Sequence, residues 1–167
     1  MIAALGTGTE FPLLSGPRSD RRLPAVLVMP GRPLRVLVVD DNESVRRSIC
    51  QILRSESDIE VVCEATDGTD ALLKLREHLP DIVLLDITMP SMNGLEVAEI
   101  MKREFPSCQV LIISQHDSRG FQWGALAAGV SGYIVKSNAG TDLIPELRRI
   151  QGLPRDTPNN PQGMKAS

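Results

Sequence analysis

Residues 35–42 read Arg-Val-Leu-Val-Val-Asp-Asp-Asn, an apolar, β-branched run that ends in two acids and an amide. The run is continuous rather than alternating, which is typical of a strand covered on both faces, as in a parallel sheet. The following stretch, 43–55, brings four apolar side chains onto one helical stripe: Val45, Ile49, Ile52 and Leu53. A buried strand followed directly by an amphipathic helix predicts the first strand–helix unit of an α/β fold.

Four further strand–helix units follow along the chain. We expect strands at Arg35–Val39, Glu60–Cys63, Ile82–Leu85, Val110–Ile113 and Tyr133–Val135, and helices at Glu43–Ser55, Gly68–Leu79, Gly94–Phe105, Ser118–Ala128 and Thr141–Ile150. The apolar stripe of the second helix is expected to run from Ala71 to Leu79. Right-handed crossovers wind this (βα)5 order into a doubly wound five-stranded parallel sheet with helices on both faces.

Pro145 falls near the fourth position of the last predicted helix. In a helix interior, its missing N–H and its ring cost about 3 kcal/mol. We therefore expect that helix either to start late or to have a distorted first turn.

The predicted domain covers residues 34–151. Residues 1–33 are dense in Gly and Pro, so we expect disorder there, with one short extended piece at 25–29. Residues 152–167 bury almost nothing and are expected to form a disordered tail.

Composition excludes several classes of protein. The chain has 167 residues, 42% apolar and 23% charged, which suits one globular domain, and no apolar run approaches the roughly 18 residues needed to span a bilayer. No basic segment precedes a long apolar stretch near Met1, so we expect a cytoplasmic protein. Three cysteines without a close pair fit neither a disulfide framework nor a zinc site, and a net charge of −3 does not suggest a nucleic-acid binder.

Polar residues end the predicted strands. Asp40 and Asp41 follow the first strand, and Asp86, Ser114 and Lys136 end the third, fourth and fifth. In an open parallel sheet these ends share one edge, where ligands bind. Two carboxylates about 5 Å apart repel by about 3 kcal/mol at an effective dielectric near 20, so the edge needs cations. Lys136 supplies one, and Mg²⁺, which prefers carboxylate oxygens and water, is the expected second.

Each of these residues also has a plainer interpretation. Acids after a strand often cap the next helix, so Asp40, Asp41 or Asn42 is a candidate N-cap. Ser114 could be an ordinary strand-end hydroxyl and Tyr133 an ordinary sheet aromatic. A carboxylate that closes the apolar run 82–85 is costly unless a site uses it.

Together, these motifs resemble the response-regulator receiver domain of two-component signalling. The resemblance covers roughly residues 34–150 and has five marks in the family's order: the acidic pair in Val38-Val39-Asp40-Asp41-Asn42, the run Asp86-Ile87-Thr88-Met89-Pro90, Asn93-Gly94, Ser114, and Lys136. The stretches 114–117 and 132–137 look most like receivers that precede a helix-turn-helix output domain.

The resemblance implies a flavodoxin-like receiver fold and a role for each residue. Asp86 would accept a phosphoryl group from a histidine kinase or phosphotransfer protein, with Lys136 paired to the phosphoryl oxygens. Asp41 would bind Mg²⁺ directly and Asp40 through water, alongside Asp86 and the Thr88 backbone carbonyl. Ser114 and Tyr133 would switch conformation, and the side chains of Thr88 and His116 would tune the lifetime of the acyl phosphate.

The same resemblance implies a signalling domain rather than an enzyme, acting on a downstream protein. Only 17 residues follow Ile150, too few for a helix-turn-helix domain, so we expect no direct DNA binding by this chain and no membrane binding. The resemblance makes a homodimer through the fourth helix, fifth strand and fifth helix a candidate assembly, and Pro145 in the fifth helix counts against it, so the oligomeric state stays open. Ser137 follows Lys136 where many receivers have a proline, often after a cis bond. A cis bond before a residue other than proline costs roughly 2.5 to 4 kcal/mol, so the sequence leaves open whether this bond is cis.

Two rival functions belong to other classes. A haloacid-dehalogenase-like phosphohydrolase also uses an aspartyl phosphate and Mg²⁺. In such enzymes, however, the nucleophile follows the first strand and the acidic pair comes late in the chain, which is the reverse of the order in this sequence. A receiver-like binding module that works without phosphorylation would keep only the fold, and the presence of Asp41, Asp86 and Lys136 argues against it.

Overall fold

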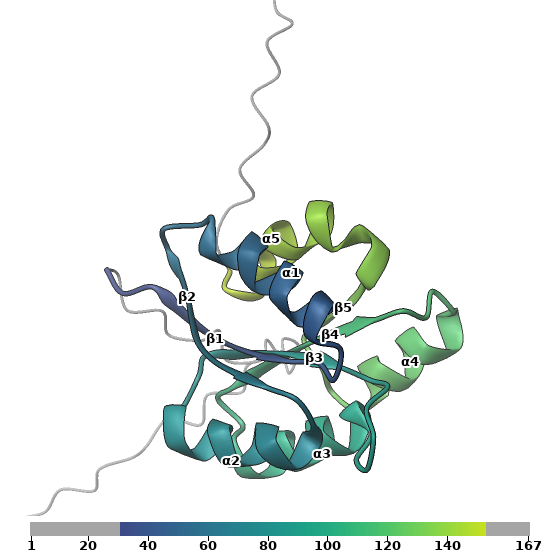
Figure 1. Ribbon diagram of the computed structural model, residues 1–167. Coiled ribbons are helices and arrows are strands. Elements are labelled where there is room, and N and C mark those ends of the chain that lie inside the picture. Colours follow the sequence, from purple (N-terminus) through teal and green to yellow (C-terminus); the bar gives the residue numbers. More distant parts are fainter. Residues whose placement is uncertain (1–30, 153–167) are drawn as a thin grey trace, which may run out of the picture.

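The computed structural model describes residues 31–152 as one parallel sheet with helices on both faces (Figure 1). Its strands are β1 (Leu34–Val39), β2 (Ile59–Ala65), β3 (Ile82–Asp86), β4 (Gln109–Ser114) and β5 (Gly132–Val135). The predicted doubly wound five-stranded fold is confirmed, and each strand is longer than predicted because strand pairing continues into flanking residues.

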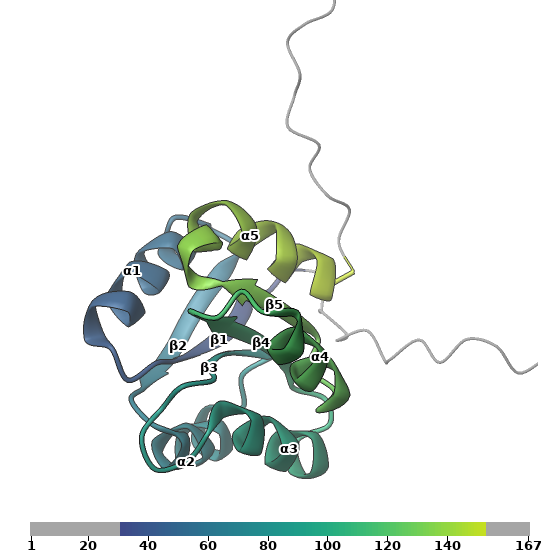
Figure 2. The ribbon, with the colours of Figure 1, turned by 90° about the vertical axis from the view of Figure 1, so that its right-hand side faces the viewer.

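Five α-helices and a short 3₁₀ helix connect and follow the strands. They are α1 (Glu43–Arg54), α2 (Gly68–His78), α3 (Gly94–Glu104), α4 (Arg119–Ala127), η1 (Lys136–Asn138) and α5 (Ala139–Ile150). Helices α1 and α5 cover one face of the sheet, and α2 and α3 lie on the other, as Figure 2 shows. Ala125 of α4 packs into the same core as α2 and α3.

The sheet separates two hydrophobic cores, which explains the continuous apolar runs. Val36, Val38 and Leu84 face α1 and α5, whereas Leu37, Val83 and Leu85 face α2 and α3. Successive strand residues point to opposite faces, and here both faces are covered, so the buried positions that point to either face are apolar.

Two helix predictions were wrong in detail. Leu79, expected on the buried stripe of α2, is 63% exposed, because it is the C-cap and its left-handed backbone (φ 46°) ends the helix. Helix α5 begins at Ala139, earlier than predicted, and continues through Pro145, whose side chain lines a surface depression beside Tyr133. The helix therefore does not start late, and Pro145 lies beyond its first turn.

Some predictions fall partly outside the described residues. Residues 1–30 and 153–167 lie outside them, so the disorder predicted for both termini and the extended piece predicted at 25–29 stay predictions. Within 31–152 all peptide bonds are trans, that between Lys136 and Ser137 included. No helix in this part of the chain is long and apolar enough to cross a membrane.

The strand order is β2-β1-β3-β4-β5, so the chain turns to opposite sides after β1 and after β3. In doubly wound sheets, ligands bind at such a switch point, beyond the carboxyl ends of the two strands. Asp40 directly follows β1 and Asp86 is the last residue of β3. The topology thus places these carboxylates at the position where a ligand is expected.

Gly94 begins α3 directly against the backbone of Asp86. Its N–H donates to the carbonyl of Ile87 at 2.9 Å, and a Cβ at this position would collide with the carbonyl oxygen of Asp86. Because a backbone atom cannot move aside as a flexible side chain does, we expect Gly94→Ala to lower the free energy of unfolding by about 3 kcal/mol. Chemical denaturation measures this value.

Gly124 provides the matched control. It lies inside α4 with open space where a Cβ would go. Gly124→Ala should therefore raise the free energy of unfolding by up to about 1 kcal/mol, through helix propensity alone. Equal effects of the two substitutions would contradict the steric argument.

Candidate functional site

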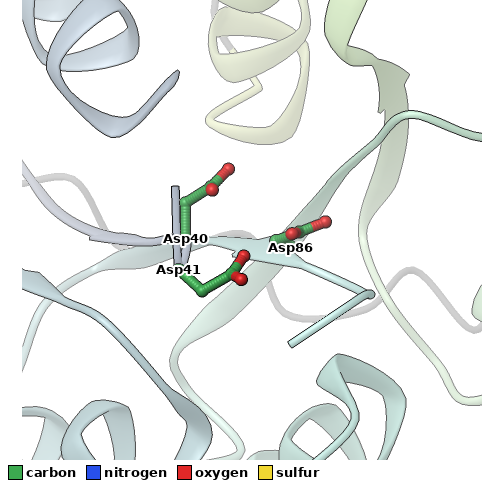
Figure 3. A group of neighbouring side chains, drawn as sticks. All are labelled: Asp40, Asp41 and Asp86. Atoms are coloured by element: carbon green, nitrogen blue, oxygen red, sulfur yellow. The ribbon is translucent and has the colours of Figure 1, made fainter. Parts of the chain in front are cut away.

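Three aspartates converge at the carboxyl ends of β1 and β3 (Figure 3). One carboxylate oxygen of each of Asp40, Asp41 and Asp86 lies within 4.8 Å of the others. Asp40 and Asp86 are almost fully buried, with 1% and 3% exposure, whereas Asp41 is exposed. The cluster therefore has a buried floor and one side open to solvent.

Lys136, which directly follows β5, offsets part of the negative charge on the buried floor of this cluster. Its Nζ lies 2.8 Å from Oδ2 of Asp40 and 3.0 Å from Oδ2 of Asp86, and its side chain is only 10% exposed. Burial by itself would lower the pKa of Lys136, but pairing with two carboxylates outweighs this and raises its pKa. One ammonium thus bridges the ends of two strands.

Asp86 keeps a raised pKa despite that ion pair. Burial is the largest cause of its raised pKa, and the charge of Asp40 adds to it, while Lys136 and the backbone N–H of Thr88 oppose it. The Thr88 N–H donates to Oδ1 of Asp86 at 3.3 Å. A carboxylate whose charge is costly in the folded state is a common mark of a functional site.

Backbone and side-chain donors hold Asp40 in place. Its Oδ1 accepts from the N–H of Asn42 at 2.9 Å, and its carbonyl accepts from Nη1 of Arg46 at 2.9 Å. The N-cap of α1 is Asn42, whose side chain accepts from the N–H groups of Ser44 and Val45. Of the three candidate caps, then, Asn42 takes the role and leaves both acids available.

Ser114, His116 and Tyr133 form a second group at the same edge. Oγ of the fully buried Ser114 accepts from the N–H of His116 at 3.2 Å. The hydroxyl of Tyr133 donates to the carbonyl of His116 at 2.6 Å. Two predicted switch residues thus hold one backbone segment between β4 and α4.

The structure brings Asp40, Asp41, Asp86 and Lys136 into one cluster. Thr88 contacts this cluster through its backbone N–H, and its side chain is exposed. The predicted Ser114, His116 and Tyr133 contact one another instead.

Sequence reasoning overlooked two residues. Arg46 holds the Asp40 carbonyl, and the ring of Phe121 stacks on that of His116 with a centroid distance of 4.5 Å. A basic residue one turn into the helix that follows an acidic pair was the available signal for Arg46.

The donor set of the acidic cluster fits a hard divalent cation. Three carboxylates offer oxygen ligands on one open side, and Mg²⁺ characteristically uses a few carboxylate oxygens and completes its shell with water. Lys136 compensates only one of the three negative charges. The residues present therefore suit Mg²⁺ better than the thiolate- and imidazole-binding metals.

Comparisons with known proteins agree with this geometry. A family model described as the response regulator receiver domain matches residues 36–148. The response regulator protein VraR of Staphylococcus saprophyticus is 37% identical over 117 residues, which cover 70% of this chain and 56% of VraR. VraR of Staphylococcus aureus is likewise 37% identical, over 116 residues. The chain thus spans about half the length of these relatives.

Solved structures give the same result. The receiver domain of the putative response regulator NarL from Mycobacterium tuberculosis is 34% identical, with a TM-score of 0.68, covering 72% of this chain and 98% of that one. A chain in the CheX-CheY-BeF3-Mg complex from Borrelia burgdorferi is 30% identical, with a TM-score of 0.68, covering 72% of this chain and 90% of that one. From its sequence match and its fold, this chain belongs to the response regulator receiver family.

Proposed function

We propose that this chain is the phosphoacceptor of a two-component phosphorelay and that Asp86 carries the phosphoryl group. The observation that carries the proposal is the buried pair Asp40 and Asp86, bridged by Lys136 beside the open Asp41, at the switch point of the sheet. The receiver family is generally a signalling domain rather than an enzyme. We further propose that the protein works in the cytoplasm.

The donor is a histidine kinase or a phosphotransfer protein. A carboxylate oxygen of Asp86 attacks the phosphorus of a phosphohistidine, a P–O bond forms, and the P–N bond breaks. The imidazole leaves with the bonding electron pair and takes up a proton. Lys136, already 3.0 Å from Asp86, pairs with oxygens of the arriving phosphoryl group, so this chain contributes positioning and electrostatics.

Mg²⁺ would be held by Asp41 directly, by Asp40 through water, and by Asp86 and the backbone carbonyl of Thr88. When bound, it would neutralise charge on the carboxylates and on the transferred phosphoryl oxygens. The support in this chain is the set of three acids with oxygens within 4.8 Å of one another.

The added charge would then switch a protein-binding surface. Ser114 gives up the N–H of His116 and turns toward the phosphoryl group, and Tyr133, which holds the carbonyl of His116, follows this segment. The side chains of Thr88 and His116 flank the acyl phosphate and set its lifetime.

A face formed by α4, β5 and α5 is the proposed docking surface, for a downstream protein or for a second copy of the chain. Three large apolar residues of α4 are exposed there: Phe121 at 40%, Trp123 at 70% and Leu126 at 53%. Such exposure is typical of an interaction surface.

Incubation with acetyl phosphate and Mg²⁺ tests the proposal. We expect each chain to take up one phosphoryl group, detected by mass spectrometry of the intact protein. Release of phosphate from many equivalents of substrate would instead support a phosphohydrolase. If the chain took up no phosphoryl group from acetyl phosphate or from phosphorylated kinases, the proposal would be wrong, and a binding module that works without phosphorylation would be the better interpretation.

Asp41→Ala separates metal binding from helix capping. We expect this variant to lose Mg²⁺ binding, measured by calorimetric titration, yet to unfold no more easily in metal-free buffer. Asp41 is exposed and repels two neighbouring carboxylates, and Asn42 caps α1. Asn42→Ala is the contrasting variant and should cost about 1 kcal/mol of stability through the lost cap. Clear destabilisation of Asp41→Ala would contradict the assignment.

A further inference from the structure

Arg46 connects the acidic cluster to β2 from the first turns of α1. Its Nη1 donates to the carbonyl of Asp40 at 2.9 Å, and its Nε donates to Oε2 of Glu64 at 3.2 Å. The Arg46 side chain is 13% exposed, so both contacts lie at the margin of the protein interior. The N–H of Arg46 donates to the carbonyl of Asn42 at 2.9 Å, which places the residue firmly in the helix.

The carbonyl that Arg46 holds belongs to the peptide between Asp40 and Asp41. A peptide unit is planar, so fixing its oxygen orients the whole plane, including the bond that leads to Asp41. The other polar groups of Asp40 are also engaged: the N–H by Ala65, Oδ1 by Asn42 and Oδ2 by Lys136. Among the described residues, Arg46 is the side chain that contacts the carbonyl of this peptide.

The charge of Arg46 is paired with Glu64 rather than with the carboxylates of the cluster. Its partner for ion pairing is Glu64, and the contact with Asp40 is to a backbone carbonyl rather than to the carboxylate. An arginine paired to the carboxylates would compete with a metal ion for the same oxygens. The planar guanidinium can hold two acceptors at once, which a lysine ammonium does less well.

We propose that Arg46 is a positioning residue for the metal site: it orients the Asp40–Asp41 peptide so that Asp41 faces the cluster, with Glu64 as its anchor. This inference rests on the proposed Mg²⁺ binding. Residues that orient metal ligands without touching the metal commonly change affinity by about tenfold or more when they are replaced.

Arg54 offers a matched control. It also lies on α1 and pairs with Glu64, at the same 3.2 Å, through the other carboxylate oxygen. Arg54→Ala therefore removes one ion pair with Glu64 and leaves the Arg46 contact with the Asp40 carbonyl in place. Arg46→Ala removes that contact together with its own ion pair to Glu64.

The experiment is a calorimetric Mg²⁺ titration of the full chain in the wild type, Arg46→Ala and Arg54→Ala, with unfolding measured in metal-free buffer. We expect Arg46→Ala to bind Mg²⁺ about tenfold more weakly and Arg54→Ala to match the wild type. Equal affinity of Arg46→Ala and the wild type would overturn the inference while leaving the proposed function standing. A wild type that binds no Mg²⁺ would overturn the proposed metal site itself.

A second pair of variants covers the case in which Arg46→Ala does not fold. Arg46→Lys and Arg54→Lys both keep the positive charge and the aliphatic stem. We expect weaker Mg²⁺ binding for Arg46→Lys alone, because an ammonium cannot reproduce the fork between Asp40 and Glu64. Identical affinities of the two lysine variants would count against the positioning role.

Discussion

Asp86→Asn should take up no phosphoryl group from acetyl phosphate in the presence of Mg²⁺, while the wild type takes up one. The amide keeps the shape of the carboxylate but is not a usable nucleophile toward phosphorus. Asp86 ends β3, and its buried side chain lies beside Lys136, the residue proposed to pair with the phosphoryl oxygens. Mass spectrometry of the intact protein measures the uptake.

Asp117→Asn is the matched control for this experiment. Asp117 is exposed in the segment between β4 and α4, at the same edge of the sheet. This variant should be phosphorylated like the wild type. If Asp86→Asn were labelled to the wild-type extent, the acceptor would be a different residue.

Asp86→Asn should also be at least as stable as the wild type at neutral pH. The pKa of Asp86 is raised, chiefly by burial, so its charged form destabilises the fold at any pH above that pKa. As the pH falls through the folded-state pKa toward the ordinary value of 3.8, the native wild type binds a proton and recovers this stability. The stability difference between the two proteins should therefore shrink on acidification, which urea denaturation at several pH values can follow.

Lys136→Met is expected to produce the largest loss of stability at the site. Lys136 bridges two carboxylates that are 1% and 3% exposed, and methionine has a similar length without the charge. Removing one partner from a buried ion pair leaves uncompensated charge, so we expect a cost of about 3 kcal/mol at neutral pH in metal-free buffer. Urea denaturation measures the difference from the wild type.

The pH dependence of that cost has a definite sign. Burial opposes the charge of Lys136, but its two carboxylate partners raise its pKa above the ordinary 10.5. Its stabilising contribution is therefore complete below about 10.5 and is lost as the pH rises through the folded-state pKa. The cost of Lys136→Met should be constant near neutrality and should fall in acid, where the carboxylates become protonated.

Added Mg²⁺ provides a further check on Lys136→Met. A divalent cation among the same carboxylates should restore much of the lost stability. The exposed Lys102, replaced by methionine, is the control and should change stability little under any of these conditions. A Lys136→Met protein as stable as the wild type without metal would show that the ion pairs contribute little to stability.

Strands and site-bearing strand ends were predictable because their signals are local. An apolar run that stops at a charged residue marks both a buried strand and the point where the chain leaves the core, so Asp40, Asp86 and Lys136 could be identified as strand-end residues. Helix ends were less accessible. Leu79 was expected in the core because its spacing suits a helix, but a cap with φ of 46° turns it into solvent.

Several individual side-chain contacts were beyond prediction, even between residues that are close in sequence. Nothing in the local pattern shows that Arg46 reaches the carbonyl of Asp40 while it pairs with Glu64 on β2, or that His116 stacks on Phe121. Which residue caps α1 was also left open among three neighbours, because that choice depends on the exact direction in which the chain leaves β1.

The amino-acid order alone determined the five strand–helix units and the polar residues at the strand ends, because hydrophobic periodicity and turn chemistry act over short stretches of chain. Tertiary structure alone decided that one ammonium bridges Asp40 and Asp86 while Asp41 stays open to solvent. Those relations depend on how strands far apart in sequence pair and on how much water the packed helices exclude, and both are properties of the folded chain as a whole.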